Sequence, residues 1–196
     1  MIEKGYFIIT DITGYTSFLT KSELDHAQHI LNALFDSQLK SIKPPLVISG
    51  FRGDAILCYV PESSANDGKI IYNQINRIYD AFIAKINEMQ VDPPCSCRVC
   101  STISLLDLKI FVHFGEYLLQ KVGDREELLG SDVIVAHRMM KNNVVKDTGI
   151  KSYLLLTEKA FEHLGVDAIR SDFIKHSETY DDIGLVDLLV APLGAH

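Results

Sequence analysis

The chain has 196 residues, of which 47% are hydrophobic and 23% charged, and its formal net charge is −7. This length and composition fit one folded domain with a full hydrophobic core and argue against long disordered regions. The negative charge offers no general attraction to nucleic acid or to an anionic membrane, and neither a signal peptide nor a membrane-spanning run is visible, so we expect a cytoplasmic protein that binds neither.

The first half of the chain predicts a strand, a helix, a hairpin and a second helix. Alternating aromatic and β-branched residues indicate a strand, and apolar residues spaced three or four apart indicate an amphipathic helix. A glycine-containing turn between two short apolar runs indicates the hairpin. The expected elements are a strand at 6–11, a helix at 22–42, strands at 46–49 and 55–60, and a helix at 71–89.

The second half begins with a cysteine-containing loop, 92–104, and then predicts more strands than helices. The expected elements are strands at 108–114 and 117–122 joined by a turn at Gly115-Glu116, a helix at 130–142, a strand at 153–156, a short helix begun by Thr157, and closing strands near Phe173 and at 185–190. This order predicts a single α+β domain, 1–196, of ferredoxin-like βαββαβ type. We expect two long helices on one face of an antiparallel sheet and a second face free for a ligand or another subunit.

Two aspartates lie where a strand meets a turn: Asp11 at the end of the first strand, and Asp54 at the exit of the first hairpin turn. Carboxylates set in apolar strands are costly to bury unless they pair or hold a cation. The pattern predicts a metal site, and the alternative is that both side chains only cap their turns.

Three cysteines, Cys95, Cys97 and Cys100, lie close together in the loop 92–104. Thiolates at this spacing could supply three ligands to Zn²⁺, with a fourth ligand from elsewhere. Free or redox-active thiols are the alternative. A zinc or redox sensor built on this loop is therefore one hypothesis for the function.

Four segments carry a family resemblance: Phe7 to Phe18, Gly53 to Ile56, Val112 to Glu116, and Gly130 to Arg138. In order and spacing they resemble the catalytic domain of class III nucleotidyl cyclases, the adenylate and guanylate cyclases, over nearly the whole chain. The Cys-x-Cys-x-x-Cys run, taken with 125–130, also looks like an uncharacterised bacterial family related to these cyclases.

The resemblance implies a site for metal and nucleotide. It implies that Asp11, Asp54 and the backbone carbonyl of Ile12 hold two Mg²⁺ or Mn²⁺ ions, and that Arg138 stabilises the transition state of cyclisation. Cyclase sites form between two such domains, so it also implies a homodimer. The residues that would contact the nucleoside triphosphate are Thr13, Gly14, Tyr15, Thr16 and Glu127.

Three features depart from the cyclase pattern. Ile134 occupies the position of the ribose-binding asparagine, Gly50 that of a base-reading residue, and no lysine follows Lys175 to contact the triphosphate. Two further hypotheses therefore stand beside the cysteine-loop sensor. One is a nucleoside triphosphate-binding domain that forms a 3′,5′-cyclic nucleotide and pyrophosphate, and the other is a catalytically degenerate dimer that senses nucleotide or binds a partner.

Overall fold

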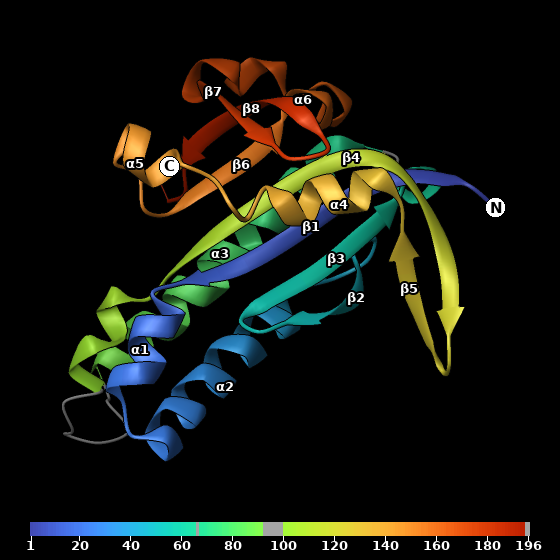
Figure 1. Cartoon of the computed structure of the whole chain (residues 1–196). Helices are drawn as coiled ribbons and strands as arrows, with labels where there is room; N and C mark the ends of the chain where they lie inside the picture. Colours follow the sequence, from blue (N-terminus) through green and yellow to red (C-terminus); the bar gives the residue numbers. More distant parts are fainter. Residues whose placement is uncertain (66, 92–99, 195–196) are drawn as a thin grey trace.

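The computed structural model of the chain describes residues 1–65, 67–91 and 100–194, with only the backbone described at 100 and 101. A twisted sheet with helices on both faces makes up the fold (Figure 1). The strands are β1 (Glu3–Thr13), β2 (Val47–Arg52), β3 (Ala55–Pro61), β4 (Asp107–Val122), β5 (Arg125–Leu129), β6 (Tyr153–Thr157), β7 (Ile174–Tyr180) and β8 (Gly184–Pro192).

The helices follow the predicted periodicity, and the two longest ones were both expected from it. They are α1 (Tyr15–Lys21), α2 (Leu24–Ser41), α3 (Gly68–Val91), α4 (Ser131–Arg138), α5 (Val144–Thr148) and α6 (Glu158–Leu164), together with the 3-10 helices η1 (Glu62–Ser64), η2 (Cys100–Leu105) and η3 (Asp167–Asp172). None of the described helices combines the length and apolar character needed to cross a membrane.

The sheet has the strand order β2-β3-β1-β4-β6-β8-β7, and β5 pairs with the end of β4, residues 118–122. Every pair is antiparallel except β4 with β6, which run parallel. Strand β1 is central and is buried along most of its length. The expected α+β architecture with a mostly antiparallel sheet is confirmed.

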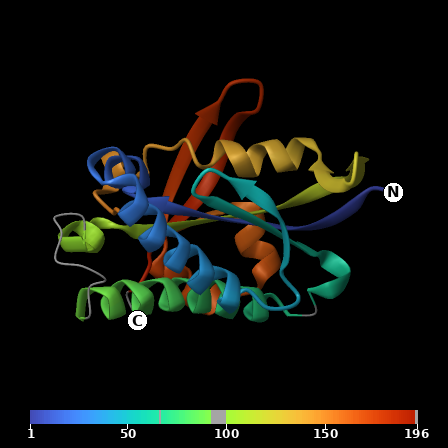
Figure 2. The ribbon, with the colours of Figure 1, turned by 90° about the horizontal axis from the view of Figure 1, so that it is seen from below.

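Each face of the sheet has its own hydrophobic core. Apolar residues of α2, α3 and α6 pack on one face, as expected for the long helices. The other face is not wholly free, because Val133, Ala136 and Met139 form an apolar stripe that packs α4 against Phe7 and other residues of β1, β4, β6 and β8. In Figure 2, α3 and α4 lie on opposite sides of the central strands.

The turn predicted at Gly115-Glu116 was wrong, because β4 continues through both residues. The hairpin turn instead lies between β4 and β5, where Gly123 adopts a φ of 63°. Gly115 serves packing rather than a turn: a Cβ at this position would lie 2.1 Å from Cγ of Asp132. The predicted helix 130–142 is also shorter, since α4 ends at Arg138 and α5 follows after a turn.

Asp132 fixes the first turn of α4 to β4. Its Oδ2 accepts the backbone N–H of Glu116 at 2.7 Å, and its Oδ1 lies 3.0 Å from Nε2 of His113. Burial lowers the pKa of His113, so the neutral ring donates its one N–H to the carboxylate, which can only accept. Nδ1 then accepts from the hydroxyl of Thr157 at 2.9 Å, and the same hydroxyl oxygen accepts the N–H of Ala160 at the start of α6.

We expect Gly115→Ala to lower the free energy of unfolding by about 1–3 kcal/mol, because the new methyl group overlaps Asp132 and forces it away from His113. Gly50→Ala is the matched control, since the nearest atom to its added Cβ is Nη1 of Arg52 at 3.8 Å. Urea denaturation measures both variants. Equal stability of the two would contradict the role assigned to Gly115.

Candidate functional site

A polar pocket with a volume of about 290 Å³ lies where β1 runs into α1 (Figure 1). Seven consecutive residues at this junction line it, together with one residue from the β2–β3 turn and one from β4. The lining residues are Asp11, Ile12, Thr13, Gly14, Tyr15, Thr16, Ser17, Asp54 and Lys109. The pocket thus contains both predicted metal-binding aspartates and the whole segment predicted to contact nucleotide, except for Glu127.

Strand register brings the charged side chains of the pocket together. Asp11 is the pairing partner of Ala55 on one side and of Lys109 on the other. Asp54 immediately precedes Ala55, so the β2–β3 turn carries its carboxylate to the end of β1. At Gly14 the chain leaves the strand with a φ of 85°, which favours glycine, and an added Cβ would lie 3.0 Å from the carbonyl oxygen of Leu105.

The surroundings of Asp11 and Asp54 raise the pKa values of both carboxyl groups. Burial, and then repulsion by Asp54, raises the pKa of Asp11 to about 6, while Lys109 acts in the opposite direction. Burial also raises the pKa of Asp54, against the lowering effect of the backbone N–H groups of Asp54 and Ile12 and of Lys109. Both acids are therefore held in surroundings that disfavour their charged forms unless a cation compensates them.

The donor set fits a hard cation that brings some of its own ligands. Within the described ranges, no group of three or more histidine, cysteine and acidic side chains is arranged to hold a metal by itself. Mg²⁺ commonly uses one or two carboxylates and completes its coordination with water and substrate phosphates. The hydroxyl of Thr13 is buried without a hydrogen-bond partner among the described residues, so a polar ligand could satisfy it.

Sequence reasoning missed Lys109. The residue lies in an apolar stretch of β4, where only the register with β1 reveals that it stands opposite Asp11. Its ammonium group lies 5.4 Å from the ring centroid of Tyr153, which places a cation between the aspartates and β6. The one sign of a functional role in the sequence was that Lys109 is a lone lysine in a predicted half-buried strand. Ser17, at the rim of the pocket, carried no such signal.

Arg138 and Glu127 do not line this pocket. Arg138 ends α4, is partly exposed, and its guanidinium has no hydrogen-bond or ion-pair partner among the described residues, which argues against a structural salt bridge. Glu127 lies on β5 with one carboxylate oxygen 3.5 Å from Nη2 of Arg52. Ile134 is 54% exposed. The predicted residues therefore form two groups, one at the pocket and one on the α4–β5 side.

The cysteine-loop hypothesis stays a prediction. Cys95 and Cys97 lie outside the described residues, and Cys100 is described only as the backbone that begins η2. Cys58, the remaining cysteine, is buried in β3. Burial raises the pKa of its thiol to about 12, so it stays protonated.

Comparison with known sequences identifies a family. Residues 31–148 match the family described as "Protein of unknown function (DUF2652)", a segment that includes Asp54 and Arg138 but begins after Asp11. The "Uncharacterized protein Rv2561/Rv2562" of Mycobacterium tuberculosis (strain ATCC 25618 / H37Rv) is 31% identical over 111 residues. That match covers 57% of this chain and 50% of the relative, so the chain spans about half the length of this curated relative.

Comparison with solved structures identifies the fold. The guanylyl cyclase Cya2 superposes with a TM-score of 0.73 at 15% identity, covering 100% of this chain and 95% of its own. The adenylyl cyclase CyaB from P. aeruginosa superposes with a TM-score of 0.64 at 14% identity, and the match covers 97% of this chain and 94% of CyaB.

The guanylate cyclase domain of RhGC from Catenaria anguillulae, solved in complex with GTP, gives a TM-score of 0.64 at 16% identity, with 98% of each chain covered. At such low sequence identities, the similarity to these three structures is evidence of the fold alone. The chain has the fold of class III nucleotidyl cyclase catalytic domains, and it belongs to the DUF2652 family.

Proposed function

We propose that the pocket binds a nucleoside triphosphate together with two divalent cations, Mg²⁺ or Mn²⁺. The observation that carries this proposal is the convergence of Asp11 and Asp54 in one pocket, half-buried, with Lys109 as the one cationic side chain that lines it among the described residues. Asp11, Asp54 and the carbonyl oxygen of Ile12 would hold the cations. The GTP complex of the similarly folded RhGC domain supports this class of ligand.

The rest of the pocket suits phosphate. The ammonium group of Lys109 supplies positive charge beside the aspartates, and the unpartnered hydroxyl of Thr13 can donate to a phosphate oxygen. Residues 13–16 line the same space, and their backbone N–H groups would be available to phosphate oxygens.

The second group of residues would act across a dimer. Arg138 and Glu127 lie outside the pocket of their own chain, so a second copy must bring them to it, as the cyclase resemblance implies. Large apolar side chains of β2, β5 and α4 are exposed and available for such an interface. They are Val47, Phe51, Leu129 and Ile134, exposed by 42–54%.

In the first of two candidate functions, this dimer cyclises its nucleotide. The ribose 3′-oxygen attacks the α-phosphorus, the bond from that phosphorus to the bridging oxygen of pyrophosphate breaks, and the 3′-hydroxyl proton passes to solvent. Bound cations would favour ionisation of the 3′-hydroxyl and offset charge on the phosphates. The guanidinium of Arg138 from the partner subunit would stabilise the charge that develops on the reacting phosphate.

A second candidate function is nucleotide binding without turnover, as a sensing or partner-binding module. The exposed aliphatic side chain of Ile134 favours it, because that side chain cannot hydrogen-bond the ribose. Poor orientation of an attacking group alone can lower a rate by on the order of 10²-fold. The metal pocket is common to both candidates, so product formation is what separates them.

Product analysis tests the proposal and separates the candidates. The purified protein is incubated with Mn²⁺ and each of ATP, GTP, CTP and UTP, and the mixture is resolved by chromatography. A cyclic product that is absent with Asp54→Ala supports the cyclase. Mn²⁺-dependent nucleotide binding without product supports the binding module, and an absence of Mn²⁺-dependent binding contradicts the proposal as a whole.

Asp11→Asn should stabilise the metal-free protein at pH 7. A carboxyl whose pKa is raised on folding contributes stability that is fully present below its unfolded value and is lost as the pH rises through about 6. The neutral amide avoids that loss, so we expect a gain of about 1–2 kcal/mol after allowing for solvent screening.

The gain from Asp11→Asn should shrink as the pH falls towards 4, and Mn²⁺-dependent nucleotide binding should be lost. Urea denaturation across this pH range measures the first effect, with the exposed Asp36→Asn on α2 as the control. Unchanged nucleotide affinity in Asp11→Asn would rule out the metal assignment.

Ile134→Asn should raise cyclisation by up to about two orders of magnitude, because it restores an amide that can orient the ribose. The side chain is exposed, so the fold should tolerate the change. The rate of cyclic nucleotide formation per dimer measures the effect, with Ile134→Leu as the control. Equal rates for the two variants would mean that ribose orientation does not limit the reaction.

A further inference from the structure

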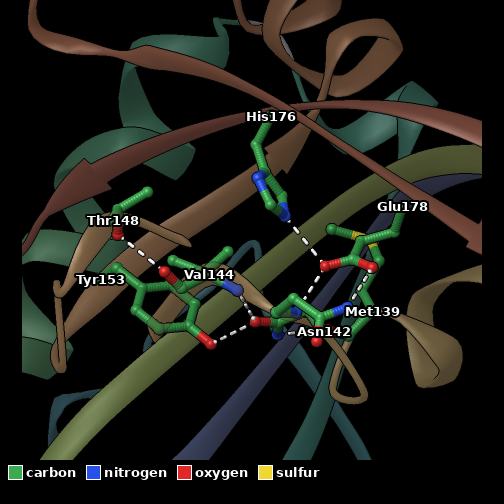
Figure 3. A network of polar contacts seen from close by, with 8 residues as sticks. Met139, Asn142, Val144, Thr148, Tyr153, His176 and Glu178 are labelled. Atoms are coloured by element: carbon green, nitrogen blue, oxygen red, sulfur yellow. Dashed lines mark hydrogen bonds and ion pairs between the residues drawn. The ribbon is translucent and has the colours of Figure 1, made fainter. Parts of the chain in front are cut away.

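The turn that follows Arg138 is held by an unusually dense set of polar contacts (Figure 3). The N–H of Lys141 donates to the carbonyl of Arg138 at 2.8 Å, and the side-chain amide of Asn142 donates to the carbonyl of Met139 at 2.7 Å. Contacts of this kind leave the last turn of α4 little freedom. Asn142 therefore fastens the backbone next to Arg138, and what holds Asn142 also holds that backbone.

Tyr153 holds Asn142 from the sheet. Its hydroxyl donates to Oδ1 of Asn142 at 2.8 Å, and the same oxygen accepts the N–H of Val144 at 3.0 Å. The ring of Tyr153 is 1% exposed and packs edge-on against Phe111, so the hydroxyl has a rigid support. Asn142 is thus tied to the turn by its amide nitrogen and to β6 by its oxygen.

Glu178 on β7 gives the turn a second attachment. Its carboxylate accepts both the backbone N–H and the side-chain amide of Asn143, the latter at 3.0 Å, and lies 2.9 Å from Nε2 of His176. Burial acts to raise the pKa of Glu178, but these contacts outweigh it and lower the pKa. The Glu178 carboxylate therefore stays charged and keeps its hydrogen bonds to Asn143.

The same tyrosine also touches the pocket. The parallel pairing of Ile110 with Leu154 sets Lys109 beside Tyr153, and the ammonium group lies 5.4 Å from the ring centroid. Lys109 in turn pairs with Asp11 across β4 and β1. The ring of Tyr153 thus lies beside Lys109, which lines the pocket, and its hydroxyl bonds the turn after Arg138.

We propose that Tyr153, acting through Asn142, is a positioning residue that fixes Arg138 relative to the Asp11–Asp54 pocket of the same chain. The inference rests on the proposed function. In a symmetric dimer each chain gives its pocket to one site and its Arg138 to the other. Tyr153 therefore joins two half-sites within one chain and keeps the spacing between them constant.

Tyr153→Phe tests this inference, because it removes the hydroxyl and keeps the ring. Tyr180→Phe is the matched control: it makes the same change in another buried tyrosine, whose hydroxyl has no hydrogen-bond partner among the described residues. Both are made in the full chain, alone and with Arg138→Ala. The measurements are the affinity for Mn²⁺ alone and the affinities for ATP and GTP in the presence of Mn²⁺.

We expect Tyr153→Phe to weaken nucleotide affinity about fivefold to tenfold, a loss of the size expected for one hydrogen bond, and to leave the affinity for Mn²⁺ alone within twofold of the wild type. The loss should vanish in the Arg138→Ala background, because a residue that acts through Arg138 has nothing left to position. Tyr180→Phe should change neither affinity.

Three results would overturn the inference and leave the proposed function standing. They are wild-type nucleotide affinity in Tyr153→Phe, an equal loss in the presence and absence of Arg138, and an equal loss in Tyr180→Phe. Wild-type nucleotide affinity in Arg138→Ala itself would mean that this arginine does not contact the bound nucleotide, and it would overturn the inference as well. A lack of Mn²⁺-dependent nucleotide binding in the wild type would contradict both the proposed function and the inference about Tyr153.

Discussion

The register of β1 between β3 and β4 is the constraint on which the rest of the structure depends. It sets Asp11 opposite Lys109 on one side and opposite Ala55, the neighbour of Asp54, on the other. Successive side chains of a strand point to opposite faces, so a slip of one residue would carry Asp11 to the face covered by α2 and α3. The buried, mostly apolar length of β1 opposes such a slip, because it would exchange the contents of the two cores. The core thus determines the geometry of the polar pocket at its edge.

That pocket works against the stability of the fold. Two half-buried acids with raised pKa values cost free energy at neutral pH, and Lys109 offsets only part of this cost. Elsewhere on the same face, the described charged groups with strong burial are well paired, as Asp132 is with His113 and Glu178 with Asn143 and His176. Acidic side chains that are paired within the chain, such as Asp132 and Glu178, stabilise the structure. Asp11 and Asp54 lack such pairing, which is typical of acids at a ligand-binding site.

The long helices, most strands and the two aspartates were predictable because their signals are local: a period of 3.6, a period of 2, and an acid at a turn. Gly115 misled the prediction, since a glycine that makes room for Asp132 looks like a glycine that makes a turn. Tyr153 and Asn142 could not have been found, because their roles depend on contacts between β6 and the turn after α4. Lys109 offered only the weak signal of a lone lysine in a half-buried strand, and its role depends on strand pairing. The metal ions, the cysteine site and the dimer stay predictions.

The length of β4 has a structural consequence. The strand begins beside the pocket, near Lys109, and its end, residues 118–122, extends beyond β1 to form a two-stranded arm with β5 (Figure 1). Sixteen residues of strand span at most roughly 50 Å. The arm is carried by β4 and is also held at its side, because Arg52 on β2 lies 3.5 Å from Glu127 on β5 and Leu128 packs on the second core. One continuous strand therefore connects the aspartate pocket to the arm that bears Glu127, so the register of β4 against β1 sets the position of both.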